Sequence, residues 1–279
     1  MTHLSHWNIK KSPFAYSGTR EWFFAGTTVE EALARIGFLI GNRRRFGIVV
    51  GPSGVGRTTL FRNVESFIAK HERKSATRVH VVSLSRSSSL TKRLMEACGW
   101  NCQGRNRNRS SEDSRFEVED LFVAMKAQNE HFTLLLDDIH LADERLQDEV
   151  SWLLRLDAPL TCIASVSDTA LAHVESSLLD RCELRIDLPR WDLGQTAEYF
   201  EAALIFADAA EDVFDSQSVI RIQELSGGVP RRISQLADLC LVAGAVQRVE
   251  QITSEIVEEI CQELPGISAN EQSLGSITA

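Results

Sequence analysis

An apolar run, a glycine-rich turn and a helical pattern follow one another between residues 46 and 69. The run at 46–50 is typical of a strand and the pattern at 60–69 of a helix, and the turn between them is Gly51-Pro52-Ser53-Gly54-Val55-Gly56-Arg57-Thr58-Thr59. Successive backbone N–H groups and the positive end of a helix meet in such a turn, so it can hold a polyphosphate. We therefore predict that these residues bind a nucleotide and that the Thr58 hydroxyl is a ligand of Mg²⁺.

One residue of this turn departs from the usual pattern. The residue before the Mg²⁺-binding threonine is normally lysine, and in this chain it is Arg57. The arginine head group is a bulky planar fork, whereas that of lysine is a compact point charge on a thin stem. Arg57 can still hold phosphate, but we expect it to displace or crowd the bound group.

A second element supports the glycine-rich turn. Leu134-Leu135-Leu136-Asp137-Asp138 is an apolar strand that ends in two acids. In a parallel sheet the carboxyl ends of the strands converge on the ligand crevice. We predict that Asp137 holds Mg²⁺ and that Asp138 polarises the water that attacks the γ-phosphorus. Two acids that merely end a strand at the surface are the alternative, and the turn argues against it.

The rest of the chain predicts an α/β fold with a second, helical part. Apolar strands alternate with helices, which indicates a parallel five-stranded sheet flanked by helices. The predicted strands are 46–50, 79–85, 132–137, 160–166 and 183–188, and the predicted helices are 57–71, 89–97, 117–129, 144–156 and 169–175. After Pro189 only helices follow, at 194–209, 215–226, 230–247 and 253–264.

These patterns divide the chain into four predicted segments. They are an N-terminal entry segment with the first helix packed on the body at 1–45, the nucleotide-binding α/β domain at 46–188, an all-helical lid at 189–264 and a disordered tail at 265–279. The polar, turn-rich residues 103–115 predict a surface loop inside the α/β domain.

Further candidate residues follow from their places in this scheme. Arg231, at the start of a lid helix, is a candidate to reach the γ-phosphate, and Arg181, before the last strand, to stabilise charge on a neighbouring subunit's nucleotide. A solvent-facing basic side chain is the alternative for both. The polar residues at the end of the fourth strand are weaker candidates to sense the γ-phosphate or orient water: Ser165, Ser167 and Asp168.

Composition is that of an ordinary globular protein, with a marked asymmetry of charge. Residues 1–136 hold 21 Lys/Arg and 12 Asp/Glu, a net charge of +9, and residues 137–279 hold 9 and 27, a net charge of −18. A basic half beside a phosphate site suits a polyanionic ligand.

The sequence also bears on location. Because it has no apolar run of about 20 residues and no signal core, we expect no transmembrane segment, no export signal and a cytoplasmic location. The six scattered cysteines are expected to be free thiols.

These motifs together resemble the AAA+ ATPases. GPSGVGRTTLFR is similar to Walker A, LLLDDIH to Walker B and GGVPRRISQLAD to a sensor-2 segment, which implies the sensor role for Arg231. Over about residues 7–264 the chain resembles the general secretion pathway protein A (ExeA/GspA)-like family, which is related to the MshM and TniB ATPases. The resemblance implies an AAA+ fold, ATP and Mg²⁺ as ligands, a homo-oligomer or larger assembly, and Arg181 as an arginine finger.

Two departures from this family bear on activity. Arg57 replaces the Walker A lysine, and Asp138 replaces the catalytic Walker B glutamate. Because aspartate is one methylene shorter, the attacking water would sit about an ångström away from its place, which can cost about 10²-fold in rate. Both departures predict that nucleotide is bound and hydrolysed slowly. A secretion role is less expected, because the membrane and peptidoglycan-binding regions of full-length members are not found in this sequence.

Two other functions remain open at this point. A DNA-associated AAA+ ATPase of the transposition or replication-initiator type would use the basic half and Arg105, Arg107 and Arg109. The sequence shows no helix-turn-helix module after the lid, which disfavours DNA as a partner. A non-hydrolysing interaction module is the other alternative, and the joint presence of Gly51, Gly54, Gly56, Thr58 and Asp137 argues against it.

Overall fold

The computed structural model describes residues 3–10, 12–14, 22–71, 77–83, 89–97, 111–209 and 212–263. Contacts within the chain divide it into two compact units. We call Val29–Leu188 the α/β unit and the combination of Met1–Thr28 and Pro189–Ala279 the helical unit. Among the described residues, none of the helices combines the length and the apolarity that a bilayer crossing demands.

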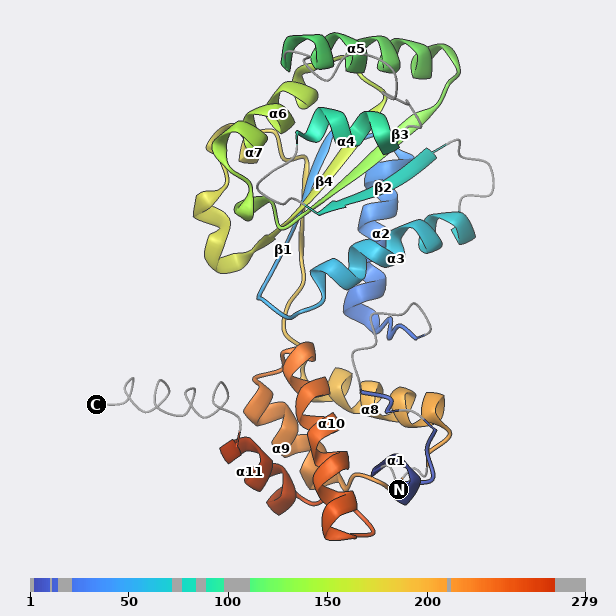
Figure 1. Ribbon diagram of the computed structural model, residues 1–279, viewed down its shortest axis with the longest axis vertical. Helices are drawn as coiled ribbons and strands as arrows, with labels where there is room; N and C mark the ends of the chain where they lie inside the picture. Colours follow the sequence, from blue (N-terminus) through green and yellow to red (C-terminus); the bar gives the residue numbers. More distant parts are fainter. Residues whose placement is uncertain are drawn as a thin grey trace, which may run out of the picture. The chain divides into compact units, whose positions relative to one another are not determined.

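The α/β unit contains a five-stranded sheet in the order β2-β3-β4-β1-β5, and every neighbouring pair is parallel (Figure 1). The predicted five-stranded parallel sheet is thus confirmed. Side chains of β1, β3 and β4 are buried along the full length of each strand, as expected of a sheet covered on both faces. The strands are β1 (Phe46–Gly51), β2 (Thr77–Ser83), β3 (His131–Asp137), β4 (Leu160–Ser167) and β5 (Leu184–Asp187).

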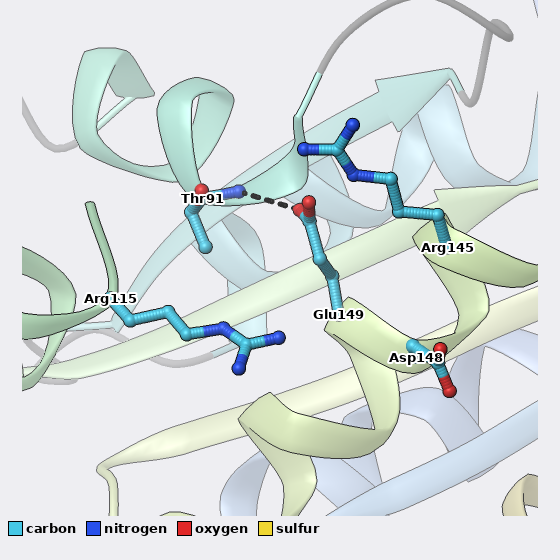
Figure 2. Close-up of a pocket in the computed structure, with 5 residues that line it drawn as sticks. All are labelled: Thr91, Arg115, Arg145, Asp148 and Glu149. Atoms are coloured by element: carbon cyan, nitrogen blue, oxygen red, sulfur yellow. Dashed lines mark hydrogen bonds between the residues drawn. The ribbon is translucent and has the colours of Figure 1, made fainter. Parts of the chain in front are cut away.

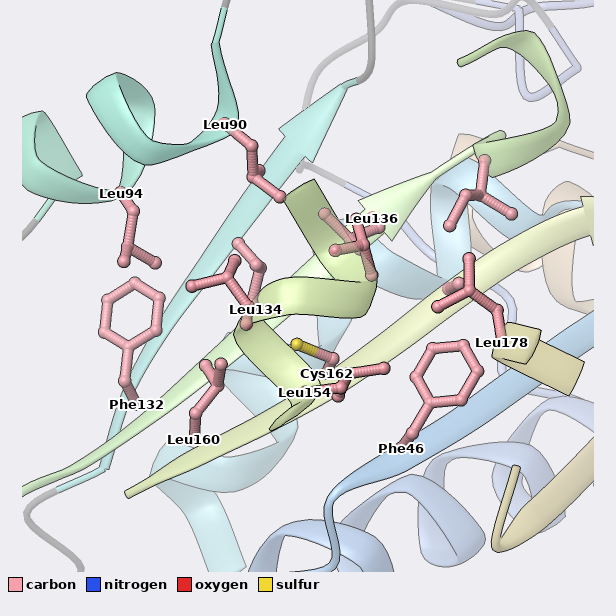
Figure 3. Close-up of a cluster of buried hydrophobic side chains, with 14 of the residues drawn as sticks. Phe46, Leu90, Leu94, Phe132, Leu134, Leu136, Leu154, Leu160, Cys162 and Leu178 are labelled. Carbon is pink, nitrogen blue, oxygen red and sulfur yellow. The ribbon is translucent and has the colours of Figure 1, made fainter. Parts of the chain in front are cut away.

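Helices cover both faces of this sheet. On one face, α4 (Leu90–Ala97), α5 (Ser111–Ala127), α6 (Glu144–Arg155) and α7 (Ser176–Leu179) enclose the main apolar core, part of which is drawn in Figure 3. α3 (Arg57–His71) packs against β1, β2 and β3, and in Figure 1 it lies with α2 (Thr27–Gly41) on the other side. Two 3₁₀ helices, η1 (Ile139–Leu141) and η2 (Asp168–His173), follow the ends of β3 and β4.

Two predicted segments of the α/β unit are corrected by the structure. The predicted loop at 103–115 is helical from Ser111, and the apolar residues Val118, Leu121, Phe122 and Met125 bury one face of this helix at helical spacing. Residues 103–110, with the three loop arginines, lie outside the described residues. The helix predicted at 169–175 is instead the 3₁₀ helix η2 followed by the short helix α7.

The helical unit is built from α8 (Leu193–Ala207), α9 (Ser216–Ser226), α10 (Pro230–Gln247) and α11 (Ser254–Glu263), with the short α1 (His3–His6) packed on α10. Gly227 and Gly228 end α9 with positive φ of 60° and 70°, which favours glycine. A Cβ on Gly228 would lie 2.2 Å from the Trp191 carbonyl oxygen, so this approach excludes any side chain. Pro230 occupies the first turn of α10, where its missing N–H is tolerated.

The N-terminal segment packs in a different place from the one expected. We expect residues 1–45 on the α/β body. Residues 29–45 belong to the α/β unit, but the structure places Trp7, Ile9 and Phe14 in the core of the helical unit. Trp7 Nε1 donates to the Leu241 carbonyl at 2.8 Å, and the Phe14 ring lies 5.0 Å from the Phe200 ring. The rings of Trp7 and Phe14 therefore find their apolar partners among the helices of the helical unit. The predicted tail at 265–279 lies outside the described residues.

Candidate functional site

The glycine-rich turn connects the carboxyl end of β1 to the first residue of α3. Gly54 and Gly56 have φ of 86° and 105°, values that residues with a side chain rarely adopt. A Cβ on Gly51 would lie 2.5 Å from the Leu188 carbonyl oxygen, so close backbone packing excludes a side chain there. Positive φ or close backbone packing thus explains why each of these three positions is glycine. The turn has the strand–turn–helix context of a phosphate-binding loop.

Thr58 and Asp137 meet beside this turn, although they lie on α3 and at the end of β3. Thr58 Oγ1 donates to Asp137 Oδ2 at 2.8 Å. The lone pairs of the hydroxyl and of the carboxylate remain available, and oxygen donors are the ligands that Mg²⁺ prefers. Among the described residues no group of three His, Cys, Asp or Glu side chains forms a metal site. Two oxygen ligands fit Mg²⁺, which usually completes its shell with water and substrate phosphates.

Ser165 holds the two acids together, and this differs from its predicted role. Its hydroxyl donates to Asp137 Oδ1 at 2.7 Å and accepts from the Asp138 backbone N–H at 2.8 Å. The residue is fully buried in β4, which lies between β3 and β1. Ser165 therefore positions the acids instead of being free to sense a phosphate. Ser167 and Asp168 bond locally to Thr169, although Ser167 lies opposite Gly51 in the β1–β4 register.

Arg57 is bonded back toward its own loop and to the second acid. Its Nη1 donates to the carbonyls of Gly51 and, at 2.9 Å, of Pro52, and its Nη2 donates to Asp138 Oδ1 at 2.7 Å. The Arg57 side chain is only 9% exposed and its Nε has no hydrogen-bond partner. Asp138 has left-handed backbone angles, with φ and ψ both 55°. The two residues that depart from the family pattern are therefore paired.

A histidine that the sequence analysis did not single out lies at the same place. His140 Nδ1 is 4.0 Å from Asp138 Oδ1. Burial lowers the pKa of His140, and Arg57 adds to this effect, while Asp138 opposes it. The ring is therefore neutral near pH 7. Its position two residues after Asp138, at the end of a buried strand, is the signal that would have identified it.

The two candidate arginines lie elsewhere in the fold. Arg181 is exposed in the turn between α7 and β5 of the α/β unit. Arg231 is exposed in the first turn of α10, in the helical unit. Their predicted roles toward nucleotide stay predictions. The other residues of the turn, Pro52, Ser53, Val55 and Thr59, lie in the loop or in the first turn of α3 as expected.

A cavity of about 200 Å³ lies away from these residues, on the α4–α6 side of the sheet. It is lined by Thr91, Arg115, Arg145, Asp148 and Glu149 (Figure 2). Glu149 is buried and accepts from the backbone N–H groups of Leu90 and Thr91, at 2.7 and 3.3 Å. Its carboxylate therefore caps the first turn of α4, which is a structural task and not a catalytic one.

Known proteins were compared with this chain by family model and by fold. Residues 29–159 match the model of the NB-ARC domain, and no curated protein matches the chain. Cdc6p from Pyrobaculum aerophilum is similar with a TM-score of 0.68 and 17% identity, over 95% of this chain and 74% of that one. The Aeropyrum pernix ORC2 protein has a TM-score of 0.65 and 14% identity, over 91% and 73%.

A third similar structure is the Thermotoga maritima RuvB Holliday junction branch migration motor, with a TM-score of 0.55 and 16% identity, over 86% of this chain and 69% of that one. Identities this low establish the fold alone, and the finer likeness to the secretion pathway protein A family stays a prediction. With the five-stranded parallel sheet, the glycine-rich turn and the paired acids, these matches show that the chain has the P-loop NTPase fold of the AAA+ type.

Proposed function

We propose that this protein binds ATP with Mg²⁺ and hydrolyses it slowly, as a nucleotide-dependent switch or remodelling component of a larger assembly. The observation that carries the proposal is the 2.8 Å contact between Thr58 and Asp137 beside a loop with two positive-φ glycines. The loop supplies N–H groups for the phosphates, and the two side chains supply oxygen ligands for Mg²⁺. Bound Mg²⁺ would offset the negative charge of the phosphates.

Slow hydrolysis follows from the state of Asp138. Its carboxylate is one methylene shorter than that of the usual glutamate, and Arg57 Nη2 lies 2.7 Å from its Oδ1. The Asp138 oxygen that accepts from the guanidinium is less available to accept a hydrogen bond from the attacking water. We expect Asp138 to orient the attacking water poorly until this pairing is relieved.

The remaining parts of the reaction come from the resemblance to AAA+ ATPases. Arg231 is proposed to contact the γ-phosphate from the lid, and Arg181 to act as an arginine finger toward a second copy of the chain. ATP and water would then give ADP and phosphate in a homo-oligomer or larger assembly. A cytoplasmic location and a likeness to the secretion pathway protein A-like ATPases are part of the same proposal, without a direct role in export.

Thermal unfolding with and without ATP–Mg²⁺ tests nucleotide binding, and a phosphate-release assay tests turnover. We expect a higher melting temperature with ATP–Mg²⁺, because a ligand that binds only the folded state stabilises it. No shift at millimolar ATP would remove the proposal, and turnover at ordinary AAA+ rates would remove only the slow hydrolysis. Size-exclusion chromatography with light scattering tests the predicted assembly.

A DNA-associated ATPase is the second candidate. It is favoured by the likeness to RuvB, a branch migration motor, and by the net charge of +9 over residues 1–136, from 21 Lys/Arg and 12 Asp/Glu. Binding that relies on phosphate contacts weakens steeply as salt rises. A salt-dependent affinity for duplex or junction DNA would support this candidate, and undetectable binding at low salt would exclude it.

A further inference from the structure

The two residues that depart from the usual nucleotide-site pattern are partners in one ion pair. Arg57 and Asp138 are 81 positions apart, and Arg57 Nη2 lies 2.7 Å from Asp138 Oδ1. The Arg57 side chain is 9% exposed and that of Asp138 is 32% exposed, so solvent screens the contact only in part. Two separate losses of function would not require their side chains to meet.

Both partners are held in place by other bonds. The Nη1 arm of Arg57 donates to the carbonyls of Gly51 and Pro52, which aims the Nη2 arm at Asp138. The Asp138 backbone N–H is fixed by Ser165 Oγ at 2.8 Å. The planar fork of arginine serves two directions at once, which the single ammonium of lysine does less well. A longer glutamate at position 138 would have to fold back to reach the same nitrogen.

The Arg57 head group is also the one that a nucleotide needs. The residue at this place in the loop reaches the β- and γ-phosphates, and the acid after the Mg²⁺ ligand faces the γ-phosphorus. Guanidinium binds carboxylate and phosphate oxygens with the same geometry. Asp138 and a γ-phosphate are therefore competitors for the Nη2 arm.

We propose that the Arg57–Asp138 pair is a latch that responds to the γ-phosphate. A nucleoside triphosphate takes the Nη2 arm of Arg57 and releases the Asp138 carboxylate, whereas a diphosphate binds with the pair intact. The latch rests on the proposed nucleotide binding and adds a specificity to it: the pair lowers the affinity for triphosphate relative to diphosphate. It also ties the freedom of Asp138 to the presence of the phosphate that is to be cleaved.

Isothermal titration with Mg²⁺ and either ADP or the β,γ-imido analogue of ATP tests the latch. Asp138→Asn keeps the shape of the side chain and removes its charge, so only a weaker, neutral acceptor competes with the γ-phosphate for Arg57. We expect the affinity for the triphosphate analogue to rise about tenfold while the affinity for ADP changes much less.

A second background separates release of the latch from general charge repulsion. In Arg57→Gln there is no ion pair, so adding Asp138→Asn relieves only the repulsion between the carboxylate and the phosphates, and the preference for triphosphate should rise by a clearly smaller factor than in the wild-type background. Melting temperatures of the four proteins without nucleotide give an independent readout. The two substitutions should be non-additive, because Asp138→Asn leaves the buried Arg57 charge, and Arg57→Gln the partly buried Asp138 charge, without its partner.

The outcomes are distinct. Two results would overturn the latch and leave nucleotide binding intact. One is an equal rise in the affinities for both nucleotides in Asp138→Asn. The other is the same gain in triphosphate preference when Asp138→Asn is made in the Arg57→Gln background. Tighter binding of the triphosphate analogue by Asp138→Asn than by the wild type, with the affinity for ADP little changed, supports the latch. If no variant binds either nucleotide, the latch and the proposed function are both rejected.

Discussion

At the scale of single residues, the contact between Thr58 and Asp137 is the sharpest feature of the molecule. The hydroxyl and the carboxylate come from different elements and lie 2.8 Å apart. Their oxygens are the donors that Mg²⁺ prefers, and Ser165 fixes the carboxylate from its other side. The site therefore depends on side chains whose exact placement can be tested one at a time.

Thr58→Ala removes one proposed Mg²⁺ ligand and the bond that orients the other. We expect the gain in ATP affinity that Mg²⁺ provides to fall by at least about tenfold, since lost metal-site bonds commonly cost 10–100-fold. Titration of ATP with Mg²⁺ and with EDTA measures this gain in each protein. A variant that keeps the full Mg²⁺-dependent gain would contradict the assignment of Thr58.

Restoring the family residues at both departures tests the account of slow hydrolysis. Arg57→Lys with Asp138→Glu replaces the forked cation and the short acid together, and we expect turnover to rise by about 10²-fold. Each single substitution should raise it less, because it leaves one departure in place. Phosphate release measures the rates, and an unchanged rate in the double variant would show that the departures are not the cause.

The stability of the folded protein should depend on pH through one identified group, His131. The Thr161 hydroxyl donates to the Arg44 carbonyl at 2.6 Å, so His131 Nε2 must be the donor in its 2.9 Å bond to Thr161. Burial, with Arg43 and Arg45 adding to it, lowers the pKa of His131 to about 4. The folded protein thus holds a neutral ring that the unfolded chain protonates near pH 6.5.

The sign of the effect follows from that lowered pKa. The stability linked to His131 is fully present above pH 6.5 and is lost progressively as pH falls toward 4. His131→Gln keeps a donor for Thr161 and removes the titration. We expect the melting temperature of the wild type to fall further than that of this variant between about pH 7.5 and about pH 5. Equal losses in the two proteins would show that His131 is not the linked group.

At the scale of elements, Glu149 ties α4 to α6. Its Oε2 accepts from Leu90 N, Thr91 N and, at 3.2 Å, Ser89 Oγ, so one carboxylate serves the first turn of a neighbouring helix (Figure 2). Side chains of α4 such as Leu90 and Leu94 are fully buried in the main core, beside Phe132, Leu134 and Leu136 of β3 (Figure 3). The capping bond therefore fixes an element whose apolar face completes the core.

Glu149→Gln removes this charge without changing the size of the side chain. We expect a loss of about 1–3 kcal/mol in the free energy of unfolding, because the amide accepts fewer bonds and the N–H groups of α4 lose a charged partner. Hydrogen exchange should quicken in the first turn of α4. Asp148→Asn makes the same change of charge at the exposed neighbouring residue, and an equal loss there would contradict the capping role.

At the scale of the whole molecule, the N-terminal segment belongs to the helical unit although residues 29–188 separate the two parts in sequence. Trp7 is 6% exposed and donates to Leu241 on α10. Ser12 Oγ donates to Asp238 Oδ1, so a second bond fixes the segment to the same helix. The described residues of this segment are a structural part of the helical unit.

Trp7→Ala should therefore destabilise the helical unit first. Truncation of a buried tryptophan costs about 3–5 kcal/mol. We expect hydrogen exchange to rise along α10 while the strands of the α/β unit keep their protection. Trp7→Phe, which retains an apolar ring and loses the bond to Leu241, should lie between the variant and the wild type. A uniform rise through both units would contradict this division.

The local patterns of the sequence were enough to predict most of the elements. The apolar runs and the glycine turn predicted the strands and the loop to within a few residues. A strand buried on both faces requires a continuous apolar run, and a positive φ favours glycine, so both features can be recognised in the sequence. The loop prediction at 103–115 was wrong from Ser111 onward, since a helix start was taken for a turn. The helix predicted at 169–175 is mostly the 3₁₀ helix η2, because a segment this short does not distinguish a 3₁₀ helix from an α-helix by its apolar spacing.

The sequence by itself determined that a glycine-rich turn follows one strand, that two acids end another strand and that the sheet is parallel, because each is a local pattern with a local physical cause. Only the tertiary structure decided that Arg57 and Asp138 bind each other and that Ser165 joins the two acids. Those contacts depend on the strand order β2-β3-β4-β1-β5, which inserts β4 between the strand before the loop and the strand before the acids. Strand order is set by long-range packing of the whole unit, and no local pattern in the chain records it.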